Sequence, residues 1–315
     1  MRGAAPLNYF LNAHGPAAHP TMVLGWVFAA IAVLACLVVG ALLAIAILRQ
    51  RPQGTGLVTS PHNGVRWVAI GTGVSSVILL GMTVYALVVL NTVGTRPAGG
   101  AIEIRVTAYD WWWRVDYPGD ADAAIVTANE MHIPVGVPVR LHLDSADVIH
   151  AFWVPQLAGK TQMIPGVHNE QWLQADRPGI YAGQCTQYCG VQHAHMAFEV
   201  IAEPMANYTA WLAAQRATPA GATAASVSQG RNLFVERCGG CHTVRGTPAA
   251  GNHGPDLTHV QSRHRIGASV LLNSQANLMR WITHAQDYKP GNRMPSMPLD
   301  PVQSAALSAF LATLQ

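Results

Sequence analysis

The stretch Gln184–Met196 reads Gln-Cys-Thr-Gln-Tyr-Cys-Gly-Val-Gln-His-Ala-His-Met, and the rest of the chain can be understood as the structure that builds, anchors or supplies it. It brings two thiols, an imidazole and a thioether into one short segment. These soft ligands together favour copper over calcium, magnesium or manganese. The candidate ligands are Cys185, Cys189, His193 and Met196.

Two cysteines are one more than a mononuclear blue-copper site uses, since that site has one thiolate, two imidazoles and a weak axial methionine. Two bridging sulfurs could hold two copper ions close enough to share an electron. The second imidazole must then come from elsewhere, and His150, which ends Ser-Ala-Asp-Val-Ile-His, is the candidate. Two other interpretations of Cys185 and Cys189 stay open: a disulfide in an exported domain, and a zinc site made of two cysteines and two histidines.

The spacing Cys-x-x-x-Cys-Gly-x-x-His-x-x-Met, with Asp-Val-x-His upstream, resembles the binuclear copper (CuA) domain of cytochrome c oxidase subunit II. The resemblance implies bridging thiolates, terminal imidazoles and one weak thioether, which would be Cys185 and Cys189, His150 and His193, and Met196.

The middle of the cysteine loop departs from the family pattern, which usually has glutamate where this chain has Gln187. The family uses the backbone carbonyl of this residue as a copper ligand, and glutamine supplies a carbonyl equally well. The family also uses the glutamate carboxylate on a magnesium ion shared with subunit I. The resemblance therefore implies the Gln187 carbonyl as a copper ligand and does not extend to the magnesium site.

The composition indicates a membrane protein with more than one domain. The chain has 315 residues, which predicts two or three domains. Only 11% of its residues are charged, against roughly a quarter in ordinary soluble proteins. The net charge is +3 without a basic block, so a nucleic-acid partner is not expected.

Two uncharged runs, 22–48 and 67–90, are each long enough to cross the ~30 Å hydrocarbon core of a bilayer as a helix. The connector between them carries Arg49, Arg51 and Arg66 and no acidic residue. By the positive-inside rule this connector is cytoplasmic, so both termini and all later domains lie on the outer face. We expect a bacterial inner membrane protein, and the hairpin resembles the subunit II anchor that packs against subunit I.

The region after the hairpin is predicted to be all-β, because short runs of alternating apolar and polar residues are separated by proline and glycine. A sandwich or barrel of about 100 residues is the expected form, and it resembles a cupredoxin. The predicted divisions are 1–95 for the N-terminal segment and hairpin, 96–203 for the copper domain, 204–227 for a short helix and linker, and 228–315 for a third domain.

A run of three tryptophans, ending at Trp113, is unusual for a soluble face. Adjacent residues of a strand point to opposite faces, so the three indoles cannot all enter one core. The run resembles the tryptophan-rich segment of subunit II, in which an aromatic lies between the copper site and the electron donor. The resemblance places Trp111 where electrons enter, and simple packing is the alternative.

The third domain contains Cys238-Gly-Gly-Cys241-His242, the motif for covalent attachment of haem c. The two thiols would bond to the haem vinyl groups while the imidazole of His242 binds the iron. The preceding linker, 217–227, is uncharged and rich in Ala, Thr and Gly, so it is expected to be a flexible coil that holds the haem near the copper domain at high effective concentration.

The sixth iron ligand is expected to be Met294 or Met297, because a thioether raises the haem potential as electron transfer needs. Met294 matches small bacterial cytochromes c better, since it lies 13 residues before Leu307 in the closing helix, and we assign it the ligand role. Three histidines are alternative ligands: His253, His259 and His264.

The order of hairpin, copper domain and fused cytochrome c resembles subunit II of caa3-type haem-copper oxidases. The resemblance implies a subunit of a proton-pumping terminal oxidase that takes electrons at haem c and passes them to binuclear copper and then to subunit I. Subunit III, a donor such as cytochrome c and membrane lipid are the other expected partners. The alternatives are the electron-accepting subunit of a CuA-containing nitric or nitrous oxide reductase, and a free-standing membrane-anchored electron carrier.

Overall fold

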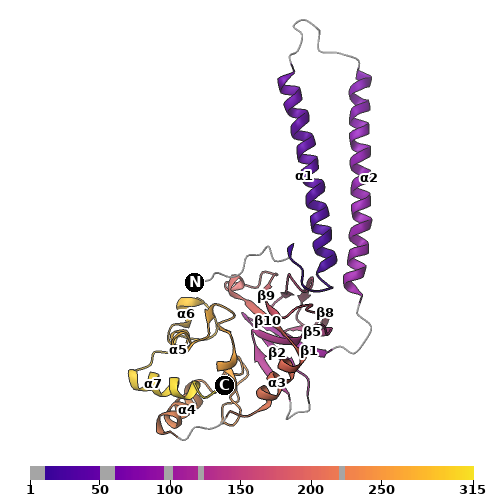
Figure 1. Cartoon of the computed structure of the whole chain (residues 1–315). Helices are drawn as coiled ribbons and strands as arrows, with labels where there is room; N and C mark the ends of the chain where they lie inside the picture. Colours follow the sequence, from indigo (N-terminus) through magenta and orange to yellow (C-terminus); the bar gives the residue numbers. More distant parts are fainter. Residues whose placement is uncertain (1–10, 50–60, 96–101, 120–123, 220–223) are drawn as a thin grey trace.

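Three parts follow one another along the chain in the computed structural model: a helical hairpin, a β-domain and a C-terminal helical domain (Figure 1). The structure describes residues 11–49, 61–95, 102–119, 124–219 and 224–315. This order confirms the predicted architecture of a two-helix anchor, a cupredoxin-like sandwich and an all-α cytochrome domain.

The hairpin consists of α1 (His19–Leu48) and α2 (Pro61–Gly94), which stand side by side and project from one end of the β-domain (Figure 1). The 30 residues of α1, at ~1.5 Å rise each, are long enough for a bilayer. Most of their apolar side chains are exposed on the outside of the helix, as in a helix surrounded by lipid. Residues 50–60, most of the connector predicted to be cytoplasmic, lie outside the described residues.

The base of the hairpin is bound to the β-domain on both of its helices. The indole Nε1 of Trp172 donates to the carbonyl of Val93 at the end of α2, over 3.0 Å. Ahead of α1, His14 N donates to Gln156 O over 2.7 Å, and Asp176 N donates to His14 O over 2.8 Å. The β-domain is therefore held at a defined position relative to the two helices.

The β-domain packs two five-stranded mixed sheets face to face, with strand orders β3-β2-β1-β5-β8 and β4-β10-β9-β6-β7. The first sheet comprises β1 (Ile102–Tyr109), β2 (Trp112–Tyr117), β3 (Ile125–Ala128), β5 (Val139–Ser145) and β8 (Asn169–Leu173). The second comprises β4 (Glu130–Pro134), β6 (His150–Trp153), β7 (Lys160–Met163), β9 (Gly179–Cys185) and β10 (Ala197–Glu203).

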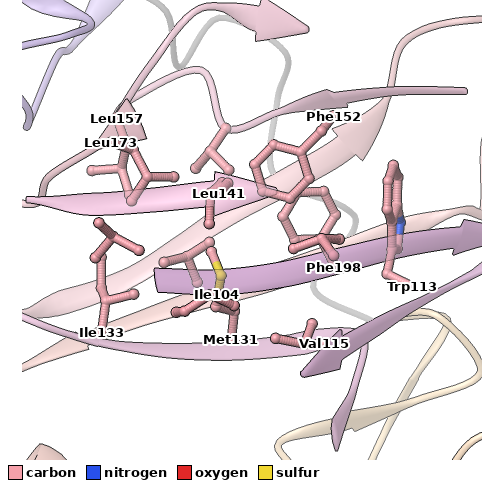
Figure 2. Packing of buried hydrophobic residues seen from close by; sticks show 14 of the residues in the cluster. Ile104, Trp113, Val115, Met131, Ile133, Leu141, Phe152, Leu157, Leu173 and Phe198 are labelled. Atoms are coloured by element: carbon pink, nitrogen blue, oxygen red, sulfur yellow. The ribbon is translucent and has the colours of Figure 1, made fainter. Parts of the chain in front are cut away.

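The core lies between the two sheets and is closed at one end by aromatic rings (Figure 2). Trp113 is fully buried, and its ring meets that of Phe152 edge-on with centroids 5.8 Å apart. Phe198 packs against both rings, at 5.0 Å from Trp113 and 4.6 Å from Phe152. Because Phe152 lies on β6 and Phe198 on β10, these rings fix the end of the second sheet from which the candidate ligands extend.

The helical domain is built on the pair α4 (Ala225–Arg237) and α7 (Pro301–Leu311). Gly230 allows their close approach, since a Cβ there would lie 2.0 Å from the carbonyl oxygen of Ala306. A capping box between Asp300 and Gln303 starts α7. The remaining elements are η3 (Val260–Ser262), β11 (Arg265–Ile266), β12 (Leu271–Leu272), α5 (Gln275–Thr283) and α6 (Ala285–Tyr288).

The connection between the β-domain and the helical domain is shorter than the predicted linker. Helix α3 (Met205–Arg216) follows β10, and α4 begins at Ala225, inside the stretch 217–227 that was expected to be a coil. The guanidinium of Arg245 in the helical domain donates to the carbonyls of Gln215 and Arg216 at the end of α3. The helical domain is therefore docked against the β-domain, whereas composition alone indicated a loose tether.

Candidate functional site

The two cysteines of the Gln184–Met196 stretch lie side by side at the end of β9. The strand ends at Cys185, and the following loop folds back so that the two sulfurs are 3.8 Å apart. Both Cys185 and Cys189 are buried and unpaired. A disulfide needs a separation of about 2.05 Å, so both thiols are available as metal ligands.

The other ligand candidates of the stretch face the same sulfurs. His193 opens the 3₁₀ turn η2 (His193–His195), and Met196 follows it directly. Side chains three residues apart lie on the same side of such a turn. The sulfur of Cys189 is accordingly 3.5 Å from Nδ1 of His193 and 3.8 Å from Sδ of Met196.

The fifth candidate, His150, comes from a different strand. It is the first residue of β6, which pairs antiparallel with β9 and aligns Phe152 with Cys185. This pairing brings Nδ1 of His150 to 3.8 Å from the sulfur of Cys185. The structure thus brings together all five predicted side chains, and we call Cys185, Cys189, His150, His193 and Met196 the sulfur cluster.

A backbone oxygen also faces the sulfur cluster. The carbonyl of Gln187 lies 3.3 Å from the sulfur of Cys185. This is the position where the sequence predicted a carbonyl donor.

Protons in the sulfur cluster are held unevenly. Hydrogen bonding from Cys189 lowers the pKa of Cys185 to about 4, and the resulting thiolate raises the pKa of Cys189 above its ordinary value. Burial opposes a charged imidazole at His150, but the carboxylate of Asp147, 2.9 Å from Nε2, and the sulfur of Cys185 outweigh it and raise the pKa of His150 to about 9. A bound cation would replace the remaining thiol and imidazole protons.

The sulfur cluster fits copper by its chemistry. Three sulfur and two imidazole donors are a soft set, and all but half-buried His193 are buried. A structural zinc site closes with four ligands, so it would leave the thioether of Met196 and the carbonyl of Gln187 without a role. The donors present therefore favour copper over zinc.

The second motif begins where helix α4 ends. Cys238 caps α4, and Cys241 and His242 follow in a turn. Nδ1 of His242 donates to the carbonyl of Pro255 over 2.8 Å, which leaves Nε2 as the nitrogen able to bind a metal. Burial lowers the pKa of His242, so the imidazole is neutral as an iron ligand must be. A Cβ at Gly254 would lie 2.6 Å from this ring, so glycine is required there.

A cavity of about 370 Å³ lies beside the motif, within the range of about 300–1,000 Å³ for ligand pockets. Its lining is largely apolar and includes both Met294 and Met297, so the cavity fits a haem and the structure keeps both thioether candidates. Of the alternative histidines, His253 lines the cavity, whereas His259 binds Arg245 and His264 faces the β-domain.

Trp111 lies between the sulfur cluster and the cavity. Its indole Nε1 donates to the carbonyl of Cys189 over 2.8 Å, and its ring is packed on Gly190, where a Cβ would be 3.0 Å from Cζ2. The same residue lines the cavity of the helical domain. Trp113 instead fills the core of the β-domain. Trp112, its neighbour on β2, lines the cavity, so these two strand residues face opposite sides as predicted, whereas Trp111 lies in the turn before β2.

Three residues at the site were not predicted to act there. Asp147 binds His150, and its only sequence signal was its place in Asp-Val-x-His. Lys289 and Arg293 come from the helical domain and reach Trp111 and Asp110 respectively. These two contacts join residues more than 170 positions apart, and no local pattern marks such contacts.

Comparisons with known proteins agree with this division of the chain. Residues 121–203 match the family described as "Cytochrome C oxidase subunit II, periplasmic domain", and residues 227–315 match the family "Cytochrome c".

Two curated relatives are subunits 2 of cytochrome c oxidases. Cytochrome c oxidase subunit 2 of Alkalihalophilus pseudofirmus is 39% identical over 68% of this chain and 61% of the relative. The chain thus spans about three fifths of that relative's length. Alternative cytochrome c oxidase subunit 2 of Bradyrhizobium diazoefficiens is 30% identical over 54% of this chain and 67% of the relative.

Among solved structures, the periplasmic domain of subunit II of cytochrome oxidase of Bradyrhizobium japonicum is 29% identical. It covers 38% of this chain and 97% of its own, with a TM-score of 0.36.

Proposed function

Because the chain belongs to the cytochrome c oxidase subunit II family, we propose that it is the electron-accepting subunit of a proton-pumping terminal oxidase with its own cytochrome c. The family membership implies copper in the β-domain and haem in the helical domain. Electrons would enter at the haem, pass to the copper and leave to the oxygen-reducing site of subunit I. The observation that carries the proposal is the position of Trp111. It contacts the loop from Cys185 to Met196, which we call the copper loop, and it lines the cavity beside Cys238 and His242, which we call the haem cavity.

The sulfur cluster would hold a binuclear copper centre. We assign Cys185 and Cys189 as bridging thiolates, His150 and His193 as terminal imidazoles, and Met196 and the Gln187 carbonyl as weak ligands. Two copper ions held there would supply a store for one electron. The burial and mutual contacts of the donors support this assignment, since a preformed site needs little rearrangement.

The helical domain would hold one haem c. We assign Cys238 and Cys241 to the thioether bonds, His242 as one iron ligand and Met294 as the other. Met294 is supported by the anchoring of its backbone, because its N–H donates to Asn292 Oδ1 over 2.7 Å and its carbonyl accepts from Gln286 Nε2 over 2.7 Å.

The partners and location follow from the family and the hairpin. The apolar faces of α1 and α2 would pack against subunit I, with subunit III and lipid nearby, and a donor such as cytochrome c would bind at the haem. We place the protein in a bacterial inner membrane with both termini and both redox domains outside. Cysteine labelling with an impermeant reagent tests this: positions 49–66 should react only after lysis, and labelling in intact spheroplasts would reverse the orientation.

The function is tested by kinetics on the purified oxidase complex. Co-purification of a large haem-bearing subunit separates an oxidase subunit from a free-standing carrier. Removing the helical domain from Ala225 onward should leave membrane insertion and copper intact but make oxidation of a soluble donor slow. The proposal fails if the truncated complex accepts electrons from that donor as fast as the intact one.

The role of Trp111 is tested in the full-length chain. The Trp111→Ala variant should load both metals yet slow haem-to-copper transfer measured by flash photolysis. A rate equal to that of the unsubstituted protein would show that Trp111 is a packing residue.

A further inference from the structure

The helical domain touches the β-domain near the sulfur cluster through one short segment, 289–293. Nζ of Lys289 donates to the carbonyl of Trp111 over 2.9 Å. The carbonyl of Pro290 accepts from the side chain of Gln192 over 2.6 Å, and Arg293 lies 3.2 Å from the carboxylate of Asp110. Segment 289–293 thus makes two contacts with Asp110 and Trp111 and one with Gln192 in the copper loop.

Lys289 is the buried member of this segment. Its exposed fraction is 4%, and burial lowers its pKa to about 7. Within the described part of the chain, no carboxylate lies within ion-pair distance of Nζ. A buried cation without an acidic partner costs free energy, and an apolar side chain of similar size would pack at lower cost. A contribution to stability therefore does not explain a lysine at this position. Its hydrogen bond to the carbonyl of Trp111 indicates instead that it holds Trp111 in place.

The backbone of Lys289 is fixed to the turn that carries the proposed iron ligand. The carbonyl of Lys289 accepts from the side chain of Asn292 over 2.6 Å. The other end of that amide, Oδ1 of Asn292, accepts from Met294 N over 2.7 Å. One amide side chain thus joins the backbone of Lys289 to that of Met294.

Trp111 is held from two directions as a result. Its indole donates to the carbonyl of Cys189 in the copper loop, and its own carbonyl accepts from Lys289 in the helical domain. The connection runs from Met294 through Asn292 and Lys289 to Trp111 and Cys189. Its hydrogen bonds are 2.6–2.9 Å long and are joined through the side chains of Asn292, Lys289 and Trp111.

We propose that Lys289 is a positioning residue for electron transfer between the two domains, which fixes Trp111 relative to both the haem turn and the copper loop. This rests on the proposed function, because it assumes that haem and copper exchange electrons across Trp111. Lys289 itself carries no electron and binds neither metal.

The test is haem-to-copper electron transfer by flash photolysis in the full-length oxidase carrying Lys289→Met, which keeps an unbranched side chain one atom shorter and removes the donor. We expect transfer about tenfold slower, since the loss of one hydrogen bond can correspond to a factor of about that size. Lys289→Arg should restore most of the rate, since it keeps the charge and the donors. The optical spectrum of the haem and the paramagnetic resonance of the copper should be unchanged in both variants.

Ser262→Ala is the matched control, because it removes an interdomain hydrogen bond from Gln215 on α3 rather than one to Trp111. It should leave the rate unchanged. A Lys289→Met rate within twofold of the unsubstituted protein overturns the proposal, and so does an equal loss in Ser262→Ala. If Lys289→Met does not assemble, Lys289→Gln and Lys289→Arg are compared, and equal rates in those two overturn it. Absence of fast transfer in the unsubstituted protein refutes the proposed function instead.

Discussion

The sulfur cluster and the haem cavity differ in how much of the proposed cofactor site the protein builds by itself. The cluster is assembled by the protein alone, with buried donors from β6, β9 and the following loop already within 4 Å of a neighbouring sulfur. The cavity is a space of about 370 Å³ between the helical domain and the part of the β-domain that carries Trp111 and Trp112, and the Cys238–His242 motif is one turn at its edge. The β-domain therefore arranges the sulfur cluster by itself, whereas the cavity leaves a space that the proposed haem would fill.

Removing haem attachment should give the largest effect. Replacing both Cys238 and Cys241 by serine leaves the cavity without its covalent occupant. The apolar side chains that line the cavity would then lose their packing partner, which destabilises the helical domain. Limited proteolysis should digest residues 225–315 while the copper signal survives. If the helical domain of this variant resists the protease, the haem is not needed to stabilise it, and the proposed difference between the two sites is wrong.

The converse change concerns the bridging sulfurs. Replacing Cys185 or Cys189 by serine removes a bridge, so the delocalised signal of the copper pair should vanish. The covalent haem should load as before, because the helical domain folds around its own core. Paramagnetic resonance and haem staining measure the two effects. Persistence of the delocalised signal in either variant would rule out the bridge.

The contact between the two regions should respond to pH through Lys289. Its folded pKa of about 7 lies below the ordinary value of 10.5, so between these values the unfolded chain binds the proton and the folded chain does not. Stability should therefore rise with pH across this window. Melting of the helical domain from pH 7 to 9 should show a steeper rise in the unsubstituted protein than in Lys289→Met. If the stability of both proteins rises equally with pH, the pKa of Lys289 is not lowered by burial.

The smallest effect is expected at Gln187, because its proposed contribution is a backbone carbonyl. Gln187→Glu should leave the copper spectrum nearly unchanged, and the added carboxylate should strengthen binding of magnesium, which prefers such oxygens. Copper content and magnesium titration check both. A large loss of copper would contradict the carbonyl role.

Most of the candidate site residues could be predicted because they lie in short sequence motifs. The stretch Gln184–Met196 holds four of the five cluster donors, and the 3₁₀ turn at His193 brings donors three residues apart to one side. His150 was found through its own short motif. The haem attachment residues are likewise contiguous.

The docking of the two domains could not be predicted in the same way. The linker was expected to be flexible from its composition, but Arg245 binds backbone carbonyls at the end of α3. Lys289 also binds a backbone carbonyl, that of Trp111. Every residue has a carbonyl, so such acceptors leave no mark in a sequence, and only the fold determines which ones meet a distant side chain.

The most direct test of the account is the metal and haem content of the purified full-length protein, read with its copper resonance spectrum. The account predicts two copper ions and one covalently bound haem per chain, with the unpaired electron shared between the coppers. A single copper ion with a localised signal, zinc in its place, or haem that is released on denaturation would contradict it.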